Sequence, residues 1–200
     1  MTAGIGKVLD SLYRMDPIRR SATIWVLLQA LLWTVFAIGY LANPGAWNGG
    51  PAAEPAAGGR LAMFMHIITN NLIVIALIAG GNLFVRFGSA TPGLLVLLLQ
   101  GITIGWIAGA NGFAVPFPSP AAANLQYLRV GLWETTAYAL ACAVTLPKSL
   151  LVAPSFPARE WTTVRSLKEL HFARTEKWLG LFALAALVGA AIVETFYLTR

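Results

Sequence analysis

Charged side chains are scarce in this chain. Asp, Glu, Lys and Arg make up only 11% of its 200 residues, whereas a soluble domain contains about a quarter. Hydrophobic residues account for 58%, and the mean hydropathy is +0.70. This composition excludes an ordinary soluble domain. It predicts an all-α integral membrane protein, because a helix satisfies its own backbone hydrogen bonds in lipid.

Cysteine and histidine are also scarce. The single cysteine, Cys142, excludes an internal disulfide and a cysteine-based metal site. With only His66 and His171 as histidines, neither a zinc site nor a Cys/His nucleophile is expected. The sequence also lacks an HExxH motif, a nucleophile elbow and a glycine-rich phosphate loop. We therefore expect no catalytic residues, no metal and no cofactor.

Long apolar runs are abundant by contrast. Several segments are long enough to cross a hydrocarbon core of about 30 Å as helices. The five predicted spans cover residues 23–42, 61–84, 92–110, 127–146 and 178–198. Before them, residues 1–16 place apolar side chains at helical spacing, which predicts a short amphipathic helix. It would lie at the membrane surface or pack on a partner.

The basic residues predict the orientation. Lys and Arg precede the first span, follow the second, and lie between the fourth and fifth, whereas residues 43–60 and 111–126 carry only Glu54 and Arg60 as charges. The positive-inside rule therefore predicts a cytoplasmic N-terminus and an outer C-terminus. Because the basic residues alternate with the spans, the net charge of +6 does not indicate nucleic acid.

A second amphipathic helix is predicted on the cytoplasmic side, over residues 158–177. Its apolar and basic residues fall on different sides at helical spacing. The expected contact residues are Trp161, Arg165, Lys168 and Arg174. They would bind anionic membrane lipids or a cytoplasmic partner, and lipids are favoured because basic amphipathic helices generally bind the membrane surface first.

Several polar side chains lie inside the predicted spans, where a charge costs about 2.5–3.5 kcal/mol and needs a partner or a purpose. His66 and Asn70 share a helix face, whereas Asn71 lies about 100° further round and can bond a different helix. The expected intramembrane polar cluster comprises His66, Asn70, Asn71, Gln100, Arg129, Glu134 and Glu194. It would act either as a relay for protons or cations, or as a hydrogen-bonded knot that fixes helix register.

Small residues predict where helices approach closely. Gly101, Gly105 and Gly109 form a doubled GxxxG pattern in the third span, and Gly131 is assigned to packing in the fourth. We expect the tight crossing to lie within the bundle. A crossing between protomers of a homo-oligomer is the alternative.

Four segments together resemble a known family. They are NNLIVIALIAG at 70–80, LLLQGITIG at 97–105, GLWETTAYALA at 131–141 and AAIVETFYLT at 190–199. Their order and spacing resemble those of the stage II sporulation protein M family, and the resemblance covers residues 64–199.

The resemblance extends to particular positions of that family. Its asparagine-rich start matches Asn70 and Asn71, its Gly-x-x-Glu-x-x-Ala motif matches residues 131–137, and its Ala-Ala-x-x-Glu ending matches residues 190–194. The chain departs from the family at Val130, where a histidine commonly precedes the glycine.

That resemblance implies a multi-pass protein of the bacterial cytoplasmic (inner) membrane. Sporulation members of the family resemble membrane scaffolds that hold peptidoglycan-degrading partners at the septum. Relatives in circular bacteriocin clusters look like secretion or immunity components that work beside ABC-type ATPases.

Two hypotheses follow. The first is a noncatalytic membrane subunit that scaffolds partner proteins, whose polar cluster would be dry and fully paired. The second is a permease-like component of a transport, peptide secretion or immunity system, whose cluster would border a cavity open to one side. A lone intramembrane enzyme would need a second carboxylate beside Glu134, for which Glu194 is the candidate.

Overall fold

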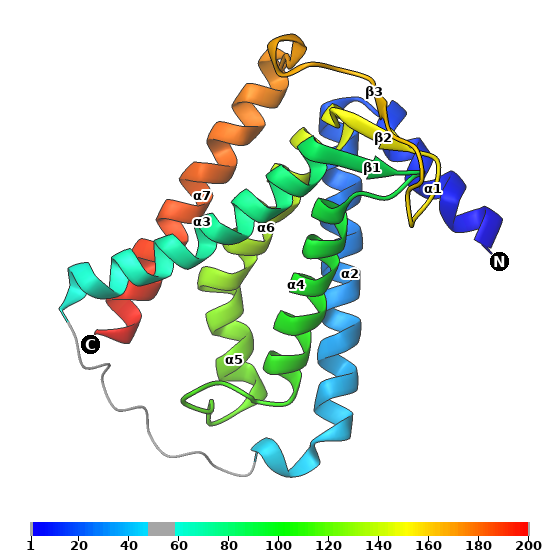
Figure 1. Ribbon diagram of the computed structural model, residues 1–200. Coiled ribbons are helices and arrows are strands. Elements are labelled where there is room, and N and C mark those ends of the chain that lie inside the picture. The colour runs from blue at the N-terminus through cyan, green and yellow to red at the C-terminus, as the bar shows by residue number, and fades with distance from the viewer. Residues whose placement is uncertain (1, 48–58, 200) are drawn as a thin grey trace.

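The computed structural model describes residues 2–47 and 59–199, so part of the predicted loop 43–60 lies outside the described residues. The chain is mostly helical (Figure 1). Its longer helices are α1 (Thr2–Arg14), α2 (Pro17–Ala42), α3 (Arg60–Phe84), α4 (Pro92–Gly109), α5 (Pro120–Gln126), α6 (Leu132–Thr145) and α7 (Arg174–Leu198). Short helical turns are η1 (Pro44–Trp47), η2 (Tyr127–Gly131), η3 (Leu146–Lys148) and η4 (Leu167–Glu169).

Four of these helices are long and apolar enough to cross a membrane: α2, α3, α4 and α7. They correspond to four of the predicted spans. The remaining predicted span, 127–146, is divided between η2, which is a turn of π-helix, and α6. The helical backbone continues from α5 through η2 into α6 without a break, because the residues at both junctions, Tyr127 and Leu132, have right-handed helical dihedrals.

Helix starts follow local sequence signals. Asp16 accepts hydrogen bonds from the backbone N–H groups of Ile18 and Arg19, and Pro17 occupies the first turn, so α2 begins six residues before the predicted span. Thr91 caps α4 in the same way through the N–H of Leu94, and Pro92 follows it. These caps place the helix ends that carry the polar residues described below.

Helix α6 lies at the centre of the bundle, where it contacts α2, α3, α4 and α7. Its small side chains make this possible: Ala137, Ala139, Cys142 and Ala143 are completely buried. Figure 1 shows α3 and α7 inclined to the α2–α4 pair, with α6 between them. A polar residue on α6 is therefore enclosed by neighbours on several sides.

Helices α2 and α4 lie side by side (Figure 1), and glycines allow their close approach. A Cβ at Gly105 would come 2.5 Å from the carbonyl oxygen of Leu32, and one at Gly101 would come 2.8 Å from the Leu28 side chain. A Cβ at Gly109 would meet the carbonyl oxygen of Phe36. The three glycines therefore face α2 within the same chain.

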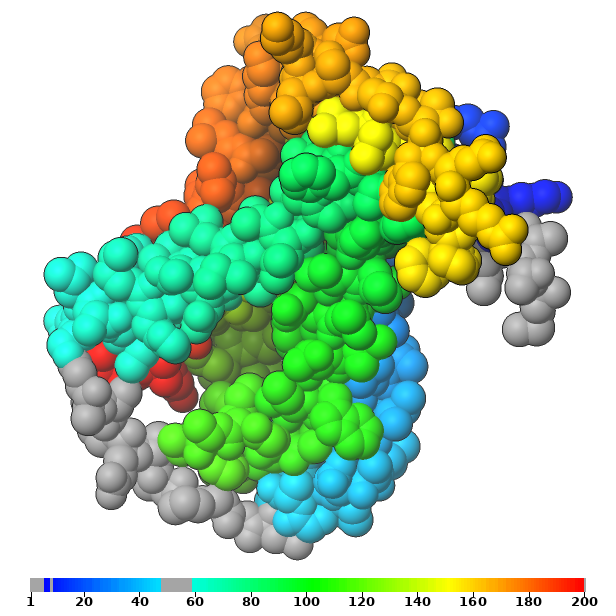
Figure 2. All heavy atoms as spheres, viewed as in Figure 1, coloured from blue at the N-terminus to red at the C-terminus, as the bar shows by residue number. Residues whose placement is uncertain are grey.

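A small three-stranded sheet caps one end of the bundle. Its strands are β1 (Val85–Phe87), β2 (Leu151–Ala153) and β3 (Thr162–Thr163). Strand β2 lies in the middle, parallel to β1 and antiparallel to β3. Figure 2 shows the yellow to orange segment that contains β2 and β3 as the outer layer of this end. The N-terminal helix α1 lies at the same end (Figure 1).

The helix predicted over residues 158–177 is wrong. This segment contains β3 and η4, and helix α7 begins only at Arg174. Thr162 pairs with Val152, and the N–H of Val164 donates to Leu150, so the edge of β2 draws this stretch into the sheet. β-branched residues suit a strand, and pairing with β2, which β1 holds from far earlier in the chain, outweighs the local helical spacing.

Helix α1 forms where residues 1–16 predict it, and it is attached to the bundle through its last turns. Leu12 is 2% exposed and belongs to the main hydrophobic core. The Tyr13 hydroxyl donates to the carbonyl of Ser89 at 3.2 Å, and the Arg86 guanidinium lies over the Tyr13 ring. Burial raises the pKa of Tyr13 to about 12, so the hydroxyl keeps its donor proton.

Candidate functional site

Glu134 is bonded to the neighbouring helix α3. Its Oε1 accepts a hydrogen bond from Asn71 Nδ2 at 2.5 Å, and Asn71 Oδ1 accepts one from the Tyr138 hydroxyl at 2.6 Å. Glu134 and Tyr138 lie four positions apart on α6, so both face α3. The Asn71 amide is thus held from both ends, which fixes its orientation and that of the Glu134 carboxylate.

The other side of Glu134 faces a cavity of about 350 Å³. Glu194 of α7 lines the same cavity, so the two carboxylates that were assigned to one polar cluster face one space. Most of the wall is apolar and aromatic. Its lining includes Trp33, Phe36, Phe113, Phe117, Gln126 and Tyr127.

The π-helical turn η2 shapes this cavity. Tyr127 donates its hydroxyl proton to Gln29 Oε1 at 2.5 Å, and Gln29 Nε2 donates to Thr135 at 3.1 Å. A Cβ at Gly131 would lie 2.6 Å from the Tyr127 ring. Gly131 therefore makes room for an aromatic side chain on its own helix rather than for a neighbouring helix.

The structure separates other members of the predicted cluster from Glu134. His66 and Asn70 bond each other at 3.1 Å on an exposed face of α3. Arg129 is exposed, and Gln100 is partly buried on α4. The predicted cluster is thus reduced to Asn71, Glu134 and Glu194, because helical spacing shows which residues share a face but not which face meets protein.

A second polar cluster, which the sequence analysis missed, surrounds Asn82 near the sheet end of α3. Asn82 is completely buried. Its Nδ2 donates to Thr145 Oγ1 at 2.9 Å and to the Cys142 carbonyl at 3.2 Å, and its Oδ1 accepts from Thr91 at 2.6 Å. The signal was available: Asn82 is an amide near the end of the predicted span 61–84.

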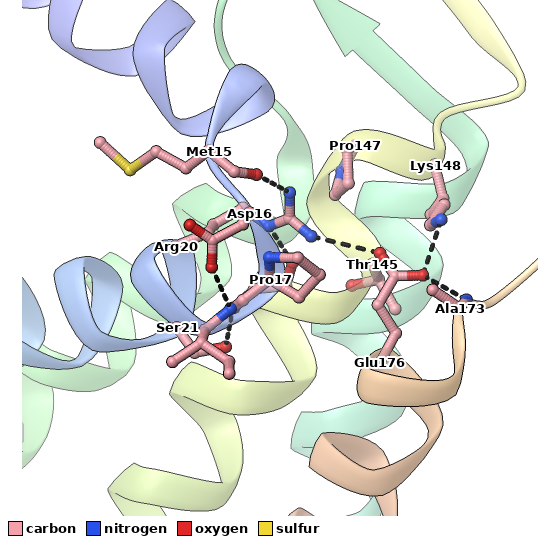
Figure 3. Close-up of polar contacts among 12 residues, drawn as sticks. Met15, Asp16, Pro17, Arg20, Ser21, Thr145, Pro147, Lys148, Ala173 and Glu176 are labelled. Atoms are coloured by element: carbon pink, nitrogen blue, oxygen red, sulfur yellow. Dashed lines mark hydrogen bonds and ion pairs between the residues drawn. The ribbon is translucent and has the colours of Figure 1, made fainter.

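A third cluster is ionic and joins α2, η3 and α7. Arg20 Nη2 lies 3.3 Å from Glu176 Oε1, and Lys148 Nζ lies 2.8 Å from Glu176 Oε2. Arg20 also donates to the carbonyls of Ala143 and Met15. Figure 3 shows the Arg20 and Lys148 side chains approaching Glu176 from different elements. Each charge thus has several partners, as a buried charge requires.

Arg20 and Glu176 were missed because both lie outside the predicted spans 23–42 and 178–198. The apolar runs do not include them, and a charge that flanks a span is normally interpreted as solvated. In the structure α2 and α7 extend beyond those runs, so their first turns bury the pair.

The first two clusters, around Glu134 and around Asn82, lie along the contact between α3 and α6. On α6 the residues that face α3 are Glu134, Tyr138, Cys142 and Thr145, and on α3 they are Asn71 and Asn82. Ile78, which lies between Asn71 and Asn82 on α3, is completely buried. An apolar side chain therefore separates the two polar groups along α3.

The predicted lipid or partner contacts lie at the sheet end. Trp161 packs edge-on against Phe87 at 5.4 Å yet remains 50% exposed. Arg165 approaches the carbonyl of Pro147, whereas Lys168 and Arg174 are exposed. Phe156, Val164 and Leu167 are exposed beside them. This surface combines aromatic and basic side chains, although they do not lie on one continuous helix.

A metal centre would need three or more ligand side chains together, and none gather among residues 2–47 and 59–199. Comparison with protein-family models, curated proteins and solved structures finds no match to this chain.

Proposed function

We propose that this chain is a permease-like component of a transport, secretion or immunity system, with five spans in the bacterial cytoplasmic membrane. Its outer cavity would take up protons or small cations at Glu134 and Glu194. The observation that carries this proposal is the position of Glu134, which is bonded to Asn71 on one side and lines the cavity with Glu194 on the other. No catalytic step is proposed.

Five spans are supported by the uninterrupted helix α5–η2–α6. If this helix crosses the bilayer with the four long apolar helices, the two termini lie on opposite sides. The end with the sheet holds Arg14, Arg86, Lys148 and Arg165. By the positive-inside rule this end is cytoplasmic, and the cavity lies toward the outside.

The cavity favours transport over a purely structural knot. A scaffold would have a dry, fully paired cluster, whereas Glu134 and Glu194 both line a cavity. A carboxylate in a membrane cavity is costly unless it binds something that offsets its charge. Along α3 a second polar group, around Asn82, lies beyond the buried Ile78, and in this proposal the apolar separation would be the closed gate of an outward-facing state.

The test is cation or proton flux in proteoliposomes that contain an internal pH-sensitive dye. We expect wild-type protein to conduct under an imposed gradient and both Glu134→Gln and Glu194→Gln to lose most of that flux. Glu160→Gln is the matched control, because Glu160 is exposed at the sheet end. Wild-type flux that equals that of empty liposomes, or that is retained in both variants, would contradict the proposal.

A scaffold for partner proteins is the second candidate, supported by the exposed surface around Trp161 and Leu167. These side chains are 50% and 73% exposed beside Lys168 and Arg174. Such a surface fits anionic lipids or a cytoplasmic partner such as an ABC-type ATPase, and a homo-oligomer is compatible with it. The resemblance to the stage II sporulation protein M family fits either candidate.

Affinity purification distinguishes the two candidates. A stoichiometric partner that is lost when Arg165, Lys168 and Arg174 are changed to alanine, but is retained in Glu134→Gln, would support the scaffold. Retention of the partner in both variants would exclude this surface as the contact.

A further inference from the structure

The cavity beside Glu134 combines three features that specify a ligand more closely than a proton. Its walls are largely apolar and include the aromatic residues Trp33, Phe36, Phe113, Phe117 and Tyr127. It contains two carboxylates, Glu134 and Glu194. None of the described residues that line it is basic. Arg129 lines two other hollows of the surface instead.

We propose that this cavity binds an amphiphilic monocation, in which a protonated amine is attached to an apolar or aromatic body. The inference rests on the proposed function, since it names the substrate class of the same cavity. The ammonium group would lie between Glu134 and Glu194, and the apolar body would lie against the aromatic wall.

Charge and hydrogen bonding both favour an amine. Two carboxyl groups that share one proton carry a single negative charge, which one cation offsets, and electrostatic attraction is strong in a largely apolar wall. Aromatic faces such as Trp33 and Tyr127 attract ammonium groups as well. Gln126 Oε1 is buried without a hydrogen-bond partner and belongs to a residue of the same lining, so it offers an acceptor for an N–H donor.

Size and rigidity favour an organic ligand over a bare ion. A volume of about 350 Å³ lies within the usual range of small-molecule sites, roughly 300–1,000 Å³. The loop that bears Phe113 and Phe117 is held in place, because Asn111 accepts from the Phe117 N–H at 2.9 Å and donates to the Phe117 carbonyl at 3.0 Å. The two rings pack edge-on at 4.8 Å. The aromatic wall is therefore preorganised.

The test is calorimetric titration of the protein in nanodiscs with 4-phenylbutylamine, with 4-phenylbutanol as a neutral probe of the same body. We expect the amine to bind at least about tenfold more tightly than the alcohol. Changing both Glu134 and Glu194 to glutamine should remove that preference, whereas Glu160→Gln should keep it. Protection of Cys142 from a thiol reagent verifies that each variant is folded, because Cys142 is completely buried.

The outcomes separate this inference from the proposed function. Equal binding of amine and alcohol, or a preference that survives in the double variant, would overturn the inference. Proton flux without amine binding would overturn it too and leave the proposed function standing. Amine binding without any proton or cation flux in proteoliposomes would support the inference and contradict the proposed permease function.

Discussion

Arg20 and Glu176 are separated by 156 positions in the chain, yet Arg20 Nη2 lies 3.3 Å from Glu176 Oε1. The two residues are only 3% and 4% exposed. They join the first turns of α2 and α7 at the sheet end, and Lys148 joins them from η3, which follows α6 (Figure 3). This pairing fixes the first and last long helices relative to each other.

Glu176→Gln should therefore be strongly destabilising. It leaves the Arg20 guanidinium buried without a counter-charge, and breaking a buried pair in this way costs about 3–5 kcal/mol. The measurement is the temperature at which Cys142 becomes reactive to a fluorogenic maleimide, because this single thiol is buried in the folded protein.

Arg19→Ala is the control for this prediction. Arg19 pairs with Asp16 at 3.4 Å, but the two side chains are 84% and 50% exposed. Exposed pairs contribute about 1 kcal/mol or less, so the transition temperature should hardly change. Similar losses in Glu176→Gln and Arg19→Ala would show that the buried cluster does not hold α2 and α7 together.

Gly105→Ala should loosen the contact between α2 and α4. The new Cβ would lie 2.5 Å from the carbonyl oxygen of Leu32, which is backbone and cannot rotate away, so the helices must separate. Overpacking of this kind costs about 1–3 kcal/mol. The same Cys142 assay should register a lower transition temperature.

Gly80→Ala is its matched control in a neighbouring helix. Nothing lies within 4 Å of a Cβ at Gly80, and alanine is the better helix former by about 0.5–1 kcal/mol. The prediction is contradicted if Gly105→Ala is as stable as Gly80→Ala.

Asn82→Leu should destabilise the protein and expose Cys142. It removes the amide that satisfies Thr91 and the Cys142 carbonyl, and buried groups left unpaired cost about 1–3 kcal/mol each. We expect faster modification of Cys142 below the transition temperature as well as a lower transition. Asn70→Leu, on an exposed face of the same helix, should leave both quantities unchanged.

Sequence patterns predicted where the helices lie in the chain more accurately than they predicted which helices contact each other. The second and third predicted spans, 61–84 and 92–110, agree with α3 and α4 to within one residue at either end. Apolar length, the Thr91 cap and Pro92 are local signals, so they can be read without knowing the neighbours. The GxxxG glycines are a further local signal, whereas the identity of their partner helix, α2, is not encoded in their spacing.

The candidate site depends on how the helices are rotated against one another, which local sequence patterns do not show. Asn70 and Asn71 are adjacent amides, but only Asn71 is turned toward Glu134. That choice depends on the rotation of α3 against α6, which distant packing determines. The stretch around Thr162 is a strand for a similar reason, since it pairs with β2, and β2 is held by its pairing with the distant β1.

The number of spans can be tested by placing cysteines in two exposed positions, Ala114 and Ser155, which precede and follow the α5–η2–α6 helix. If that helix crosses the membrane, the two positions lie on opposite sides, with Ala114 outside. A membrane-impermeant maleimide should then label Ala114→Cys in intact spheroplasts and label Ser155→Cys only after permeabilisation. Native Cys142 is completely buried and provides the unlabelled background.

A four-span arrangement predicts a different result. If α5–η2–α6 does not cross, Ala114 and Ser155 lie on the same side, and both cysteines label in intact spheroplasts or neither does. Labelling of Ser155→Cys alone would mean five spans with the opposite orientation. In that case the basic sheet end would face outward and the Glu134 cavity would open to the cytoplasm, so the flux assay would have to be run with the gradient reversed.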